Sequence, residues 1–137
     1  MLSWSRRRNF LVTAATLDNV DALQHFKPPR GCFDLTPIIC VAARVGSLEG
    51  LYEIKSWVQG DILTAGRLYE AGLMEAIKSG QLMTIMFLIS CLCELECLDL
   101  EKIRQRAVGW AETSDHEPVS TLLQQWKTEV SDNFLPA

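Results

Sequence analysis

Apolar residues recur every three or four positions along most of the chain, which is the spacing of helices that bury one face. Residues 41–54 (VAARVGSLEGLYEI) and 72–93 (GLMEAIKSGQLMTIMFLISCLC) share one layout, in which a glycine separates two apolar segments of helical period. The matching positions are Ala42 with Ala76, Gly46 with Gly80, Leu48 with Leu82, and Leu51 with Ile85. Residues 13–26 give a weaker copy. These matches indicate a repeat of paired helices.

The pattern predicts four helical pairs, the first in residues 5–26 and the second in residues 32–57. The third is centred on residues 72–93 and the fourth occupies residues 100–127. In the second pair, Thr36 is the expected cap, Pro37 the first helical residue and Gly46 the end of the helix. Residues 58–68 form the first longer connection, with a turn at Gly60 and Asp61.

The segment Leu82–Cys93 is apolar on most of its helical circumference. A helix that is apolar nearly all round is usually buried on several sides. We therefore expect this helix in the middle of the array, covered by its neighbours.

The length of 137 residues and the 48% content of apolar residues suit one domain with a real core. We expect a single helical repeat domain over residues 1–130 and a flexible C-terminal tail over residues 131–137. The fold class that follows is all-α, a solenoid of about four helical hairpins.

The formal net charge of −4 argues against nucleic acid or an anionic membrane as partner, because both select a basic surface. The longest apolar run has about a dozen residues, short of the roughly 20 that a spanning helix needs. Five cysteines, an odd number, favour a reducing compartment over a secreted disulfide framework. The expected location is intracellular, cytoplasmic or nuclear.

Paired helices, an Ala-Ala before a helix-ending glycine and a following apolar triad resemble ankyrin repeats, best in VAARVGSLEGL and EAIKSGQLMTI. The resemblance implies a stack of helical pairs that binds partner proteins. The chain departs from the family pattern because Thr36-Pro37 lies one residue further from Ala42-Ala43, Ile39 replaces the histidine and the glycine-asparagine loop is missing. The helices should therefore match the family better than its hairpin fingers, and an irregular helical solenoid explains most of the same signals.

Catalytic and metal-binding motifs are weak. Cys91, Cys93 and Cys97 form the densest cysteine group, but the paired CxxC layout of structural zinc sites is absent. The two histidines, His25 and His116, lie in no nucleophile motif. We therefore predict no catalytic residues, no metal and no cofactor, and the cysteines are expected to pack in the core.

The predicted function is non-catalytic binding of a partner protein through a concave surface of first helices and loops. The candidate contact residues are Arg44, Glu75 and Lys78, at outward positions of the first helices, with Trp57 and Tyr69 as aromatic anchors. One alternative is a small helical enzyme or an apolar-ligand-binding protein with a pocket between helices. Another is a subunit that self-associates through its apolar end faces; the oligomeric state does not follow from the sequence.

Overall fold

The computed structural model describes residues 3–28, 34–58, 60–95 and 99–134, and side chains as far as Trp126. These residues contain eight α-helices and no strand, so the predicted all-α class is confirmed. The helices are α1 (Trp4–Thr16), α2 (Val20–His25), α3 (Thr36–Val45), α4 (Leu48–Trp57), α5 (Ile62–Ser79), α6 (Leu82–Glu94), α7 (Leu100–Glu112) and α8 (Glu117–Phe134).

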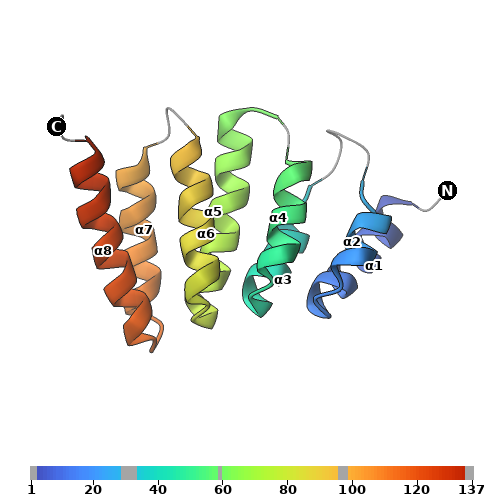
Figure 1. Ribbon diagram of the computed structural model, residues 1–137, viewed down its shortest axis with the longest axis horizontal. Coiled ribbons are helices and arrows are strands. Elements are labelled where there is room, and N and C mark those ends of the chain that lie inside the picture. Colours follow the sequence, from blue (N-terminus) through green and yellow to red (C-terminus); the bar gives the residue numbers. More distant parts are fainter. Residues whose placement is uncertain (1–2, 29–33, 59, 96–98, 135–137) are drawn as a thin grey trace.

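Consecutive helices form four pairs that stand side by side from the N-terminus to the C-terminus (Figure 1). The first helices of the pairs (α1, α3, α5 and α7) form one layer, and the second helices (α2, α4, α6 and α8) form the other. The turns within the pairs lie at one edge of the stack, and the connections between pairs lie at the opposite edge. The first helices contact one another much more extensively than the second helices do.

Small residues allow this close contact between α3 and α5. Ala42, Ala43 and Ala76 are fully buried, and Gly72 lies directly against the neighbouring helices. A Cβ atom on Gly72 would sit 3.4 Å from both Ile39 Cγ1 and Leu88 Cδ1. Short side chains bring helix axes together, and the larger apolar residues then fill the space between the two layers.

The helix-ending glycines lie where the repeat places them. Gly46 (φ 76°) and Gly80 (φ 70°) are left-handed C-caps of α3 and α5, and each backbone N–H donates to carbonyls of the last turn. Only glycine adopts this conformation without steric cost. Ser47 caps α4, because its Oγ accepts a hydrogen bond of 3.1 Å from the Gly50 N–H. The predicted end of α3 at Gly46 and the glycine between α5 and α6 at Gly80 are confirmed.

Two predicted boundaries are wrong. Residues 62–68 belong to α5 and not to a connection, because Asp61 Oδ1 accepts from the Thr64 N–H at 2.7 Å and starts the helix there. Thr36 is the first residue of α3 and not its cap, and its N–H donates instead to Asp34 Oδ1 at 2.9 Å. The signal for α5 was thus Asp61, which caps the helix by accepting a hydrogen bond from an otherwise unpaired N–H. At α3, Asp34 lies before the cap position Leu35 and accepts a hydrogen bond from the first helical N–H.

At the C-terminus, α8 continues to Phe134, past the expected end of the domain at residue 130. No proline or glycine interrupts residues 119–134, so nothing in the sequence stops the helix before Pro136. Residues 135–137 lie outside the described residues, and the flexibility of the tail stays a prediction.

Helix α6 is not covered on all sides, contrary to the prediction. Leu88 and Leu92 are fully buried, but Leu82, Met83 and Met86 are 38%, 62% and 49% exposed. The reason is that α6 packs closely on α5 but only lightly on α4 and α8. One apolar side of α6 therefore faces outward.

Side-chain contacts join the turn of each pair to the pair before it. Ser47 donates to the Asp18 carboxylate, and Gln81 Nε2 donates to the Arg44 carbonyl at 3.1 Å. His116 Nε2 lies 3.2 Å from the Lys78 carbonyl. Ser47, Gln81 and His116 each stand directly before the second helix of a pair, so the residue at this place holds its pair against the one before it. We call these three contacts the turn contacts.

None of the helices, over the residues that the structure describes, combines the length and the apolar character required to cross a bilayer.

Candidate functional site

The outward side chains of α3, α5 and α7 form one surface, which we call the first-helix face. It comprises Arg44, Arg67, Glu70, Ala71, Met74, Glu75, Lys78, Arg106 and Trp110. Two ion pairs and a shared hollow connect α3, α5 and α7 across this surface.

The predicted residues Arg44 and Glu75 are brought together by the structure. Arg44 Nε lies 3.2 Å from Glu75 Oε2 and links α3 to α5. The Arg44 side chain stays 56% exposed, whereas the Glu75 side chain is 20% exposed. An exposed ion pair of this kind contributes roughly 0–1 kcal/mol to stability. The arginine therefore remains available to a partner while the glutamate is largely covered.

A second ion pair, absent from the sequence-based candidates, links α5 to α7. Arg106 binds the carboxylate of Glu70 with two nitrogens, and the distance from its Nη2 to Glu70 Oε1 is 2.8 Å. The hydrogen bond to Glu70 is the chief reason that the pKa of Arg106 is raised above its ordinary value. Again the arginine side chain is half-exposed (50%) and the glutamate mostly covered (18%).

Lys78, the third predicted charged residue, is exposed near the C-terminal end of α5, one turn beyond Met74 and Glu75. Arg67, near the start of the same helix, is exposed as well. Within the described residues neither side chain makes a hydrogen bond or an ion pair. Neither cation is therefore paired with a carboxylate of the first-helix face, although the charge of Arg67 helps to lower the pKa of Asp61 at the start of α5.

Trp57 and Tyr69 do not serve as exposed anchors, which corrects the prediction for these two residues. Trp57 is 6% exposed, and its Nε1–H donates to Glu53 Oε1 at 3.1 Å. Tyr69 is 5% exposed, and burial, followed by the nearby Cys91 and Glu94, raises its pKa to about 12. Both were expected beside a projecting loop, but α5 begins at Ile62, so both rings pack inside.

The aromatic residue on the first-helix face is Trp110 of α7, which is partly exposed. With Arg67, Glu70, Ala71 and Met74 of α5 it lines a hollow of about 200 Å³ between the two helices. Trp110 was not among the aromatic residues singled out from the sequence, so this role was missed. Arg106 could have indicated the exposure of Trp110. Residues four apart in a helix lie on the same side, and a charged residue marks the outward side.

A second surface lies between α4 and α6 in the layer of second helices. The rings of Tyr52 and Phe87 meet with centroids 4.6 Å apart, beside the exposed Met83 and Met86. These four residues line part of a groove of about 260 Å³. Lys55 Nζ closes one end through an ion pair of 2.8 Å with Glu94. This groove is the more apolar of the two surfaces, and we call it the second-helix groove.

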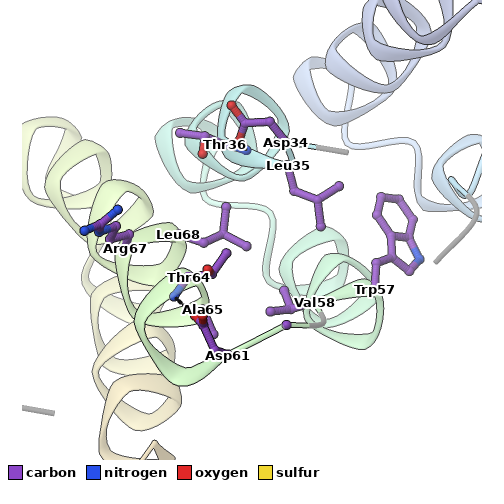
Figure 2. Close-up of a pocket in the computed structure, with 11 residues that line it drawn as sticks. Asp34, Leu35, Thr36, Trp57, Val58, Asp61, Thr64, Ala65, Arg67 and Leu68 are labelled. Carbon is purple, nitrogen blue, oxygen red and sulfur yellow. Dashed lines mark hydrogen bonds between the residues drawn. The ribbon is translucent and has the colours of Figure 1, made fainter. Parts of the chain in front are cut away.

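A cavity of about 480 Å³ lies at the edge where pairs connect, between the start of α3, the end of α4 and the start of α5. Figure 2 shows Leu35 and Leu68 reaching into it from opposite sides, while Arg67 points away from Trp57 and Val58. Asp34 and Asp61 line it too, but each accepts the hydrogen bond that starts a helix. Their carboxylates are therefore committed to the fold.

Those two hydrogen bonds predict a pH dependence of stability. Hydrogen bonds from Thr64 lower the pKa of Asp61 below 3.8, and those from Thr36 do the same for Asp34. A carboxyl whose pKa is lowered by folding stabilises the folded state. This stabilisation is complete above pH 3.8 and is lost as the pH falls through the pKa of the folded state. We expect the melting temperature of the wild type to exceed that of Asp61→Asn near neutral pH.

This difference should shrink between about pH 4 and about pH 2, as Asp61 becomes protonated. Asparagine is the matched control because it also caps helices but does not titrate in this range. Melting temperatures measured by circular dichroism at several pH values test the prediction. A difference that stays constant down to the lowest pH would contradict it.

The cysteines and histidines form no reactive site among the described residues. Cys91 is 1% exposed, and burial raises its pKa to about 11, so it is a thiol at neutral pH. Over these residues no three His, Cys, Asp or Glu side chains gather in a metal-binding group. Cys97, one of the three cysteines in the densest group, lies outside them, as does Cys32. His116 holds a turn contact, and His25 packs edge-on against Phe26.

Comparisons of the chain with protein-family models, with curated proteins and with solved structures found no match.

Proposed function

We propose that this chain is a non-catalytic protein-binding module, built as a helical-hairpin solenoid resembling a degenerate ankyrin array, that engages its partner through the first-helix face. The residues that would form a hairpin finger in such an array fall largely outside the described residues. The proposal therefore rests on the helical layer and not on fingers.

The hollow between α5 and α7 is the observation that carries the proposal. Trp110 and Met74 offer partly exposed apolar surface there, and Arg67 and Arg106 stand beside it. Tryptophan and arginine are the side chains that most often dominate binding energy at interfaces. An apolar hollow rimmed by charge is the arrangement of an interface centre with a polar rim.

The packing of the two layers supports the same face. Because the first helices lie closer to one another than the second helices do, their layer is the shorter side of the stack. A stack curves towards its shorter side, and solenoids bind partners in the resulting concavity. The ion pairs between α3, α5 and α7 would hold that surface in one shape, which lowers the entropic cost of binding.

The alternative of a small enzyme or a carrier of apolar ligands has weaker support. The cavity beside Leu35 and Leu68 is large enough for a small molecule. Its polar lining, however, includes Asp34 and Asp61, whose carboxylates already accept backbone hydrogen bonds at the starts of α3 and α5. Self-association through the end of the stack also stays a prediction, with Phe10, 48% exposed on α1, as its most apolar element.

Affinity capture from a lysate of the native host, followed by mass spectrometry, tests the proposal. Ala71→Gln adds a neutral side chain inside the hollow, where it should block a partner without changing charge. Ser90→Gln is the matched control, because it adds the same side chain at an exposed position of the second-helix groove. We expect wild type and Ser90→Gln to retain a partner that Ala71→Gln loses.

Two outcomes would overturn the proposal. If Ser90→Gln alone loses the partner, binding uses the second-helix groove. If wild type retains no protein beyond a resin control while a small apolar molecule raises its melting temperature, the pocket hypothesis replaces the binding module.

A further inference from the structure

Charge is segregated between the two layers of the stack. The four first helices contain nine basic and four acidic residues, a formal charge of +5. The four second helices contain two basic and seven acidic residues, a formal charge of −5. The remaining segments carry −4, so the formal net charge of −4 conceals a basic layer.

The acidic residues of the first-helix face are already neutralised. Glu70 and Glu75 are mostly covered and are paired with Arg106 and Arg44, whose side chains are half-exposed. A guanidinium has five N–H donors, and within the described residues Arg44 uses only Nε for its glutamate. The pairs therefore present the arginines outward and hide the glutamates behind them.

Three exposed cations that form no ion pair among the described residues add positive charge to the first-helix face and its surroundings. Arg67 borders the hollow beside Trp110, and Lys78 lies further along α5. Lys102 of α7 is exposed as well and stands one turn before Arg106 on the same helix. A ligand in the hollow would thus meet positive charge along both helices that form it.

We propose that the first-helix face binds an acidic segment of a partner protein, one that carries an apolar or aromatic side chain for the hollow beside Trp110. Carboxylates of such a segment match the planar donor pattern of Arg44, Arg67 and Arg106. This inference rests on the proposed function and adds the chemistry of the partner.

A nucleic acid fits the same surface less well. Its charge extends over many phosphates, and the acidic second helices and connections would repel the parts that pass beyond the first-helix face. Nonspecific binding of a single strand also uses several aromatic side chains on which successive bases stack. Trp110 is the one aromatic side chain lining the hollow. A short acidic peptide needs only the one face.

The test measures fluorescence anisotropy of a labelled peptide of alternating glutamate and serine with one central tryptophan. Arg67→Gln/Lys78→Gln removes two charges from the face, and we expect its affinity for the peptide to fall about tenfold. Thr121→Glu/Gln125→Glu is the control, because it changes net charge equally at exposed positions of α8. Its affinity should change by no more than about twofold, since those positions lie in the other layer.

Two further probes separate charge from shape. The same peptide with lysine in place of glutamate should not bind, and raising salt from about 0.05 M to about 0.5 M should weaken the acidic peptide. Ala71→Gln should also weaken the acidic peptide, because it fills the place of the tryptophan.

The inference is overturned if wild type ignores the acidic peptide at low salt, or if both double variants lose affinity equally. The assignment of the partner as a protein segment is overturned if a single-stranded oligonucleotide of the same charge binds as tightly as the peptide. In either case, partner capture that depends on Ala71 would leave the proposed function standing, so the two failures can be told apart.

Discussion

Replacing Leu88 with alanine should lower the free energy of unfolding by about 2–5 kcal/mol. Leu88 is fully buried on α6, and its Cδ1 would be 3.4 Å from a Cβ atom on Gly72 of α5. Such close packing leaves the backbone little room to collapse into the cavity that the substitution creates. Because domains of this size are stable by only about 5–15 kcal/mol, the loss should be visible directly in the denaturation midpoint.

Met86→Ala is the matched control for this prediction. Met86 lies on the same helix but is 49% exposed, so its truncation should change stability by no more than about 0.5 kcal/mol. Chemical denaturation of both variants, followed by circular dichroism, provides the comparison. Equal losses in the two variants would mean that α6 does not bury the side that the structure assigns to the core.

Replacing Gly46 with alanine should cost about 2 kcal/mol. The left-handed backbone at φ 76° accounts for about 1–2 kcal/mol of this, because an L-residue places its Cβ too close to the carbonyl oxygen. The added Cβ would also lie 2.6 Å from Gln81 Oε1 and displace that side chain. Gln81 would then lose its hydrogen bond to the Arg44 carbonyl, worth about 0.5–1.5 kcal/mol.

Gly109→Ala should stabilise the folded state, in contrast to Gly46→Ala. Gly109 lies inside α7 with ordinary helical geometry, and an added Cβ would meet no atom within 4 Å. Alanine in an exposed helix interior stabilises by about 0.5–1 kcal/mol relative to glycine. Thermal melts of the two variants should therefore shift in opposite directions, and a stabilised Gly46→Ala would contradict the turn geometry.

Much of the helical structure could be predicted because its signals are local. A glycine at the end of a helix, a serine before the next one and alanines inside the stack each act within a few residues, so Gly46, Ser47 and Ala42 could be placed from their neighbours alone. The same holds for the all-α class. The predicted start of α5 was wrong for a related reason, because Asp61, which caps the helix, was interpreted as part of a turn.

Exposure was harder to predict, because it depends on how far neighbouring pairs stand apart. The apolar circumference of α6 indicated burial on several sides, yet the spacing of the second helices leaves Met83 and Met86 outside. Trp57 and Tyr69 were interpreted as anchors because they are aromatic. Aromatic residues also occupy buried positions of a helix, as these two do. The hollow beside Trp110 depends on the distance between two helices that are remote in sequence, and no local pattern encodes it.

The turn contacts have a consequence for how the chain tolerates changes in length. They fix neighbouring pairs at one edge of the stack, whereas the connections between pairs lie at the opposite edge (Figure 1). The matching positions Ala14, Ala42 and Ala76 are 28 and 34 residues apart, yet all three are buried in the first-helix layer. Insertions and deletions in the connections therefore leave the register unchanged, while a single inserted residue at a turn would move every later pair.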